Sequence, residues 1–387
     1  GALPDKSVRE KGPVKINHDL YRPRLKGWTQ AIQANGAKVA AQLAVYGFWA
    51  KGGYGEPAEE VSPSGVRLDG DQYRPDLDGL TFIRGGRPLE VDEIKMIEEE
   101  VARSAVRAVK AGFDAIELQA LGGNLLSRFL SPLTNKRKDA YGGSLENRSR
   151  ILVETIAAIK REVGDDFPLI CRINGDDLLD GGMVPGDYQA LVPLLEEAGV
   201  HALNLMPGWY ETRKPVNQMN VSRGAFVYAA AALKQVAQIP IAANIRINDP
   251  IMAEQILSSG QADIVAMCSA LMADPYLPQK AQEGRLEDIR PCVACCNCWS
   301  DLAGRRIPIG CSVNARMGME AKYVAEPARN PRTSGVIGGG PAGLEAARGA
   351  ATRGRRVAGC EKRVRLGGQM LSADLPPHHR DWRELNS

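Results

Sequence analysis

Short apolar runs recur along the chain from residue 38 and alternate with longer stretches of helical spacing. The apolar runs are KVAAQL (38–43), FDAIEL (113–118), PLICRI (168–173), ALNL (202–205), IPIAAN (239–244) and ADIVAM (262–267). Helical periodicity covers residues 91–111, 146–163, 188–198 and 250–259, and glycines at 112 and 199 mark two helix ends. Apolar strands that alternate with helices predict an α/β fold with a parallel sheet covered by helices.

Polar residues fall at the ends of these strands, where a (β/α)₈ TIM barrel forms the rim that binds ligands. The residues concerned are Gln42, Glu117, Arg172, Asn244 and Cys268. Six strand–helix units can be counted, whereas a closed barrel needs eight. Because the chain opens in a loop and continues into a helix, we expect the first two strands to precede residue 1. The barrel is predicted over residues 1–286.

Four cysteines lie in the run PCVACCNCWSDLAGRRIPIGC. Cys292, Cys295, Cys298 and Cys311 are separated by two, two and twelve residues. Closely clustered thiolates are the ligands of iron–sulfur clusters, and this spacing favours a [4Fe–4S] cluster. A zinc site is the alternative, although structural zinc usually uses two separated cysteine pairs. Cys296 is out of step with the repeat and is interpreted as a bystander. The cluster segment is predicted over residues 287–332.

A glycine-rich motif begins a third segment, predicted over residues 333–387 as the start of a dinucleotide-binding domain. Gly338, Gly340 and Gly343 follow a short apolar run and precede a helical stretch, and Glu361 ends the next apolar run. In this context the glycines allow the pyrophosphate to approach the backbone, and the acid binds ribose hydroxyls. About 55 residues are too few for such a domain to complete a core. We therefore expect an internal fragment of a longer protein.

Composition and charge narrow the class of protein. The 387 residues carry a net charge of +3, which gives no nucleic-acid footprint. Eight cysteines, half of them in one cluster, do not form a disulfide framework. No apolar leader opens the chain and no stretch approaches a membrane span. The expectation is a soluble cytoplasmic protein that acts on a small molecule, without nucleic-acid or membrane partners. A homo-oligomer is compatible with this expectation.

The order of barrel, four-cysteine run and dinucleotide motif resembles the iron–sulfur branch of the old yellow enzyme family. That branch includes 2,4-dienoyl-CoA reductase, trimethylamine dehydrogenase and 2-enoate reductase. The resemblance extends from about His18 to Met370. It rests most on AGFDAIEL (111–118), FLSPLTNKRKDAYGGSLENRSR (129–150), GWYETRKP (208–215), RINDP (246–250), MADP (272–275) and GGGPAGLEAA (338–347).

The resemblance implies FMN at the barrel rim, FAD at the glycine motif and NAD(P)H as electron source. Gln42 is similar to the glutamine that bonds the flavin pyrimidine edge, and Arg172 to the arginine beside flavin N1. Asn244, Ile245 and Arg246 match the loop that holds the FMN phosphate, together with the next loop. The family usually has an arginine in that next loop, where this chain has Ser269 after Cys268.

The implied catalytic positions differ from the family pattern. Where relatives read E-I-H-G-A-H-G-Y-L, this chain reads ELQALGGNL, so Gln119 and Gly122 replace histidines and Asn124 replaces the tyrosine that donates a proton. An amide cannot act as an acid. Tyr210, in GWYETRKP, occupies the family's active-site histidine position and is the remaining candidate acid. It is either a proton donor or an aromatic pocket wall.

The function implied by the resemblance is electron transfer from NAD(P)H through FAD and a [4Fe–4S] cluster to FMN, which reduces a conjugated C=C bond of an enoyl- or dienoyl-CoA-type substrate. Basic residues after Tyr210, Arg213 and Lys214, are candidates for contacting a CoA phosphate. Two alternatives stay open: an amine dehydrogenase or demethylase of the trimethylamine dehydrogenase type, and a catalytically reduced electron-transfer subunit.

Overall fold

The computed structural model describes residues 14–49, 59–68, 85–213, 216–305, 307–324 and 326–385. The chain divides into two compact units. The first unit contains residues 1–216, 226–245 and 255–266, and the second contains residues 217–225, 246–254 and 267–387. Lys214, a candidate CoA contact, lies outside the described residues.

The first unit is built on a parallel sheet of six strands in the order β1-β5-β6-β7-β8-β9. All six strands predicted from the apolar runs are present. They are β1 (Ala40–Ala44), β5 (Ala115–Ala120), β6 (Leu169–Ile173), β7 (Ala202–Leu205), β8 (Ile241–Ala243) and β9 (Ile264–Val265). Neighbours in the sheet are neighbours in sequence, as in a TIM barrel.

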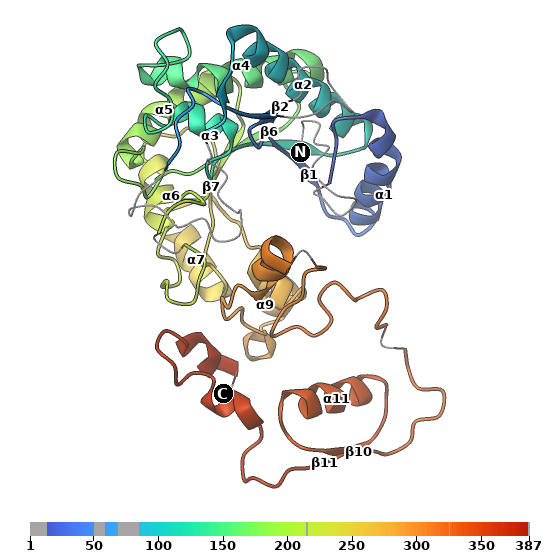
Figure 1. Cartoon of the computed structure of the whole chain (residues 1–387). Coiled ribbons are helices and arrows are strands. Elements are labelled where there is room, and N and C mark those ends of the chain that lie inside the picture. Colours follow the sequence, from blue (N-terminus) through green and yellow to red (C-terminus); the bar gives the residue numbers. More distant parts are fainter. Residues whose placement is uncertain are drawn as a thin grey trace. The chain divides into compact units, whose positions relative to one another are not determined.

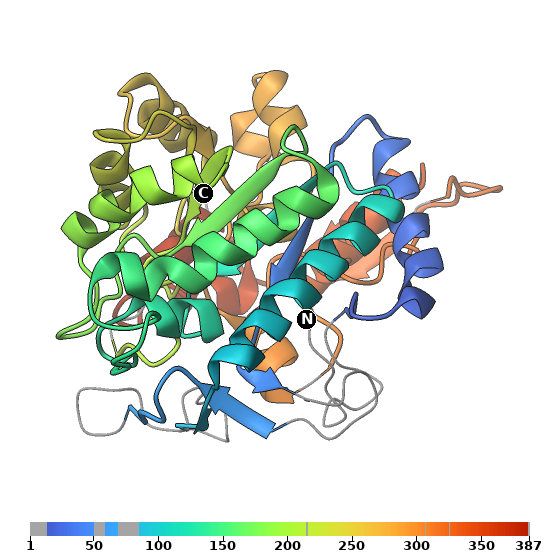
Figure 2. The same ribbon diagram turned by 90° about the horizontal axis from the view of Figure 1, so that it is seen from above.

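Helices cover the outer face of this sheet (Figure 1), because each strand-to-strand connection in a parallel sheet must return along one face. They are α1 (Arg22–Gln33), α2 (Val91–Lys110), α4 (Leu145–Val163), α5 (Pro185–Glu197), α6 (Val227–Lys234) and α7 (Pro250–Ser258). Figure 2 shows α2 and α4 side by side along the sheet. Gly112 and Gly199 have φ of 87° and 95°, which confirms the predicted glycine stops after α2 and α5.

The core of the first unit lies between this sheet and its helices. Strand residues that point outward, such as Leu43, Ile116 and Leu118, are at most 1% exposed. The residues that alternate with them include Gln42, Glu117 and Gln119, so period-2 alternation turns polar side chains away from the apolar outer layer. A cap of capping-box type starts α2, where Glu93 accepts from the Glu90 N–H at 3.0 Å.

Short elements that the sequence pattern did not predict join the first unit. A small sheet contains β2 (Phe48–Trp49), β3 (Glu59–Ser62) and β4 (Arg87–Pro88). Helix α3 (Leu125–Leu130) follows β5, and all six of its residues are buried. A run of two to six residues is too short for periodicity to identify it.

The second unit contains short helices followed by a strand–helix–strand motif. The helices are α8 (Ser269–Ala273), α9 (Leu277–Gln282) and α10 (Asn297–Trp299), with a π-helical turn over Ser300–Arg305. Strand β10 (Ser334–Ile337), α11 (Pro341–Thr352) and β11 (Val357–Cys360) follow, and the two strands pair in parallel. Single 3₁₀ turns lie at Leu286–Asp288, Gly368–Ser372 and Arg380–Leu385 in this unit, and at Asp19–Tyr21 in the first unit. Within the described ranges, no helix is long and apolar enough to cross a membrane.

Candidate functional site

Four polar side chains from neighbouring strands form the rim of the first unit. Gln42 on β1 donates to the carboxylate of Glu117 on β5. Asn204 on β7 donates to the other oxygen of Glu117 at 2.7 Å, and Arg172 on β6 lies 3.9 Å from this carboxylate. The sheet register places Gln42 opposite Glu117 and Arg172 opposite Asn204. The structure therefore brings together Gln42 and Arg172, as the predicted flavin site requires.

Some hydrogen-bond donors of the Arg172 guanidinium are not used within the described part of the chain. One terminal nitrogen contacts the sulfur of Met206 at 3.5 Å. The Nε of Arg172 is buried and has no hydrogen-bond partner in the described part of the chain. The Oδ1 of Asn204 is also buried and has no hydrogen-bond partner there. Buried polar atoms without partners are costly in a finished core and common where a ligand completes the hydrogen bonding. This rim fits a flavin, whose ring edge carries both donors and acceptors.

A hydrogen-bond network fixes the loop that follows β5. Asn174, directly after β6, accepts from the Gly122 N–H at 2.9 Å and donates to Asp177 at 2.8 Å. Asp177 is fully buried and also accepts from the Tyr188 hydroxyl at 2.7 Å. Burial raises the pKa of Asp177, and these donors oppose the rise. Asn174 thus positions the backbone at Gly122.

Tyr210 lies over Gly122. Its backbone N–H donates to the Gly122 carbonyl at 3.4 Å, and a Cβ added at Gly122 would lie 3.0 Å from Cε2 of the Tyr210 ring. Burial raises the pKa of the half-buried Tyr210 phenol, and the nearby Arg172 charge lowers it. With the rise dominant, the phenol keeps its proton at neutral pH. The structure places Tyr210 at the rim, within electrostatic range of Arg172.

Gln119 and Asn124, the two amide side chains of the segment ELQALGGNL, are buried beside this loop. Asn124 is 0% exposed, and neither its Oδ1 nor its Nδ2 has a partner among the described residues. Gln119, on β5, is 6% exposed, and its Oε1 is likewise unpartnered. Below them, buried Arg128 of α3 donates to the Gly123 carbonyl at 2.7 Å. Burial lowers the pKa of Arg128, and the charge of Glu211 opposes this shift.

The predicted phosphate residues are found in both units. In the first unit, Asn244 accepts from the Ile245 N–H at 2.7 Å, and Ile245 has a φ of 70°. In the second unit, Cys268 caps α8 and Ser269, its first residue, is exposed.

Arg246, also in the second unit, is buried and already engaged by protein groups. Its guanidinium donates twice to the Val221 carbonyl, at 3.0 and 2.8 Å, and to Asp381 at 2.8 Å. Arg223 lies 3.5 Å from the same Asp381. The predicted phosphate donor is therefore neutralised by an aspartate in this structure.

The cysteine run forms a compact loop in the second unit. Ala294 and Cys296 adopt left-handed φ values of 50° and 56°. The Ala294 N–H donates to the Cys292 sulfur at 3.4 Å, and the Cys295 thiol contacts the Ser312 hydroxyl at 3.3 Å. Hydrogen bonds to sulfur are among the groups that tune an iron–sulfur cluster. Cys296 instead points its thiol at the Asn217 carbonyl, 3.6 Å away.

The four candidate ligands are half-buried free thiols within range of one another's charge. Burial raises the pKa of Cys298 and Cys311, and the neighbouring cysteines add to the rise. Within the described residues, no group of three or more His, Cys, Asp or Glu side chains is arranged to hold a metal ion. The four thiols lie within electrostatic range of one another and supply the donor chemistry that Cys₄ ligation needs, so the donor set fits the cluster.

The glycine motif has the geometry of a nucleotide-binding turn. Gly338, with a φ of 98°, ends β10, and Gly340 caps α11. A Cβ on Gly343 would lie 1.8 Å from the Gly338 carbonyl oxygen, so only glycine fits there. Glu361, after β11, accepts from the Gly339 N–H at 2.6 Å, and this bond lowers the pKa of its carboxyl. The turn, the helix N-terminus and the acid fit an adenine dinucleotide.

Sequence reasoning missed several residues of this site. Glu117 was recognised only as a polar strand end, although it bonds Gln42 and Asn204 and faces Arg172. Its place opposite Gln42 in the sheet register is the signal that could have identified it. Asn174 and Asp177 follow β6 in the run NGDD, but no local signal reveals that they anchor a loop 52 residues earlier.

Known families match most of the chain. The NADH:flavin oxidoreductase / NADH oxidase family matches residues 4–288, and the FAD dependent oxidoreductase family matches residues 335–385. Together these matches imply FMN and FAD as the flavins.

Similar proteins have reductase and oxidase names. A metal reductase of Desulforamulus reducens is 41% identical over 97% of this chain, and an NADH oxidase of Thermoanaerobacter brockii is 36% identical over 96%. The structure of 2-naphthoyl-CoA reductase with 2-naphthoyl-CoA has a TM-score of 0.87 and 32% identity over 95% of this chain. The chain covers 54%, 57% and 56% of these proteins, about half of each. The chain therefore belongs to the NADH:flavin oxidoreductase / NADH oxidase family, in the old yellow enzyme and trimethylamine dehydrogenase-like branch that its motifs indicated.

Proposed function

We propose that the chain is part of an oxidoreductase that uses electrons from NAD(P)H to reduce the conjugated C=C bond of an enoyl- or dienoyl-CoA-type substrate. When bound, FMN would supply hydride at the rim, and FAD with a [4Fe–4S] cluster would supply the electron path to it. Support comes from the flavin oxidoreductase family and from the similarity to a reductase whose structure holds an aryl-CoA.

The observation that carries the proposal is the position of Tyr210. Reduction of a C=C bond places a hydride on one carbon and a proton on the other, so an acid must stand beside the site of hydride delivery. Tyr210 is held over Gly122, and burial raises the pKa of its phenol, so it keeps a proton to donate. The family's usual tyrosine position, Asn124, has no acidic proton.

The buried amides suit a different task. Asn124 has a donor and an acceptor that no described residue satisfies, and Gln119 has a free acceptor. An amide N–H can hold a substrate carbonyl oxygen without releasing a proton. In this arrangement Asn124 orients the thioester carbonyl and Tyr210 protonates carbon. Arg172 supplies the fixed positive charge of the rim, which favours a reduced, anionic flavin ring.

The test separates proton delivery from electron supply. The FMN-loaded protein is reduced with dithionite under anaerobic conditions and mixed with crotonyl-CoA or cinnamoyl-CoA. Tyr210→Phe should slow substrate reduction by about 10²–10⁴-fold, the usual contribution of a general acid, and leave flavin reduction unchanged. Tyr276→Phe, which changes an exposed tyrosine of the second unit, is the matched control. Turnover within about twofold of wild type would show that Tyr210 only lines the pocket.

A second function is favoured by the absence of acids at Gln119, Gly122 and Asn124. An electron acceptor that needs no proton on carbon would not require them, and the relatives named metal reductase and NADH oxidase are compatible with such chemistry. Under this alternative the reduced wild-type protein and the reduced Tyr210→Phe variant would reduce Fe(III) citrate or oxygen at the same rate. Neither protein would reduce a CoA thioester. Reduction of the oxidised, FMN-loaded protein by methylamines, with the amine oxidised by two electrons, would favour an amine dehydrogenase instead.

A further inference from the structure

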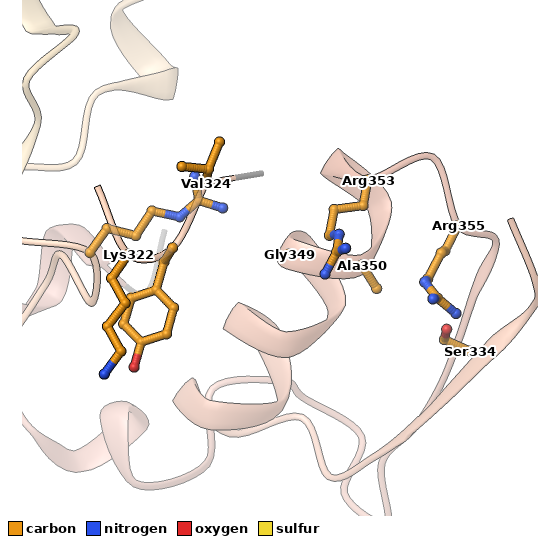
Figure 3. A pocket seen from close by; sticks show the side chains of 9 residues that line it. Lys322, Val324, Ser334, Gly349, Ala350, Arg353 and Arg355 are labelled. Carbon is orange, nitrogen blue, oxygen red and sulfur yellow. The ribbon is translucent and has the colours of Figure 1, made fainter. Parts of the chain in front are cut away.

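A basic pocket of about 520 Å³ lies in the second unit, and its lining includes none of the candidate cluster cysteines or motif glycines. Four cationic side chains line it: Arg316, Lys322, Arg353 and Arg355 (Figure 3). Its volume is that of a pocket for a small molecule. No carboxylate is among its lining residues.

The four cations have no ion-pair partners. In the described part of the chain none of them forms a salt bridge, and two of them make contacts with uncharged groups. Arg353 donates from Nε to the Glu326 carbonyl at 3.0 Å, and the Lys322 ammonium lies 5.7 Å from the Tyr323 ring centroid. Glu345 on α11, which is paired with Arg348, is a carboxylate within electrostatic range of Arg316. The four cations of the pocket exceed this negative charge, so a bound anion would be favoured.

The end of helix α11 explains only part of the cluster. Cations near a helix C-terminus interact favourably with its dipole, which accounts for Arg353 and Arg355. Arg316 and Lys322 come from a separate segment that precedes β10 and gain nothing from that dipole. Two separate segments therefore contribute positive side chains to one pocket, which favours a ligand site over a helix cap.

We propose that this pocket binds a phosphate-rich anion. The forked guanidinium groups of Arg316, Arg353 and Arg355 match phosphate oxygens in geometry as well as charge. The exposed ring of Tyr323 and the small residues Gly349 and Ala350 form an apolar wall beside them, which a nucleotide base can cover.

The pocket is distinct from the glycine turn. The turn joins the end of β10 to the start of α11, whereas the pocket takes Ser334 from the start of β10 and Gly349 to Arg355 from the end of α11. Twelve helical residues separate the two ends of α11, which corresponds to roughly 18 Å at 1.5 Å per residue. A dinucleotide phosphate at the turn therefore leaves the pocket vacant.

The test measures binding of pyrophosphate and of ADP to the purified protein by isothermal titration calorimetry. Lys322→Gln combined with Arg355→Gln removes two charges of the pocket and spares Arg353, whose side chain also bonds the backbone. Arg24→Gln combined with Lys26→Gln removes two exposed charges of α1 and is the matched control. The pocket variant should bind pyrophosphate at least about tenfold more weakly, and the control should stay within about twofold of wild type, because charge lost far from an exposed site is screened.

Comparing the affinities for pyrophosphate and ADP shows whether the pocket recognises phosphate alone or a whole nucleotide. Tighter binding of ADP than of pyrophosphate would identify a nucleotide, and equal binding would identify phosphate alone. The proposal is overturned if neither ligand binds saturably, or if the pocket variant binds pyrophosphate as tightly as wild type, since the binding would then belong to the glycine turn.

Discussion

The contact between Gly122 and Tyr210 predicts a specific cost for adding a single methyl group. Gly122 has a φ of 69°, and a Cβ there would lie 3.0 Å from the Tyr210 ring. In Gly122→Ala the left-handed backbone costs about 1–2 kcal/mol, and displacing the ring from its rotamer adds about 0.5–1.5 kcal/mol. The free energy of unfolding should therefore fall by about 1.5–3.5 kcal/mol.

A matched glycine isolates the contact from the backbone cost. Gly143 also has a positive φ, 89°, but a Cβ there would meet nothing within 4 Å. Gly143→Ala should cost only the backbone share, about 1–2 kcal/mol. Urea denaturation at constant m value measures both variants. In a Tyr210→Ala background the extra cost of Gly122→Ala should disappear, because the ring is gone. Equal costs for the two glycines, or an unchanged cost without the ring, would refute the contact.

Three further predictions concern other parts of the chain. Gly343→Ala should abolish FAD binding, measured by flavin retention, because the added Cβ would lie 1.8 Å from a carbonyl oxygen. In contrast, a Cβ at Gly349 would meet no atom within 4 Å, so Gly349→Ala should stabilise α11 by about 0.5–1 kcal/mol. Cys298→Ser should remove iron and the absorbance of the reconstituted cluster, whereas Cys296→Ser should retain both. Burial raises the pKa of Glu98 from its usual 4.5 to about 7, so the folded protein holds this proton more tightly than the unfolded chain. Stability should fall as pH rises through that window, and Glu98→Gln should flatten the difference in urea midpoint between pH 5 and pH 8.

The strands and long helices could be predicted because each carries its own periodic signal. The apolar run at 168–173 becomes β6, and the helical spacing at 146–163 becomes α4 within one residue at its start. Helix α3 was missed because six buried residues contain no amphipathic contrast. The small sheet of β2, β3 and β4 was missed because its strands are short and its pairing is not local.

The proximity of Gln42 and Arg172 could be predicted because each lies near the end of its own strand, whereas pairs of distant residues that act together were missed. Gln42 and Arg172 end strands, and strand ends meet at one rim in a parallel barrel. The bond from Gly122 to Asn174 joins residues 52 apart, and nothing in either local sequence indicates the other. The same is true of Gly122 and Tyr210, whose unusual identities were visible separately. The structure shows that the side chain missing at Gly122 makes room for the ring of Tyr210.

Arg246 shows why residue type alone does not identify a ligand-binding group. Its place after β8 predicted a phosphate contact, yet its guanidinium donates to Asp381 and to the Val221 carbonyl. Breaking a buried ion pair leaves an uncompensated charge and costs about 3–5 kcal/mol, so a phosphate must replace Asp381 rather than add to it. In this arrangement the cation is held by the protein itself. While Asp381 keeps its place, the charge of Arg246 is balanced within the second unit and is not available to a further anion.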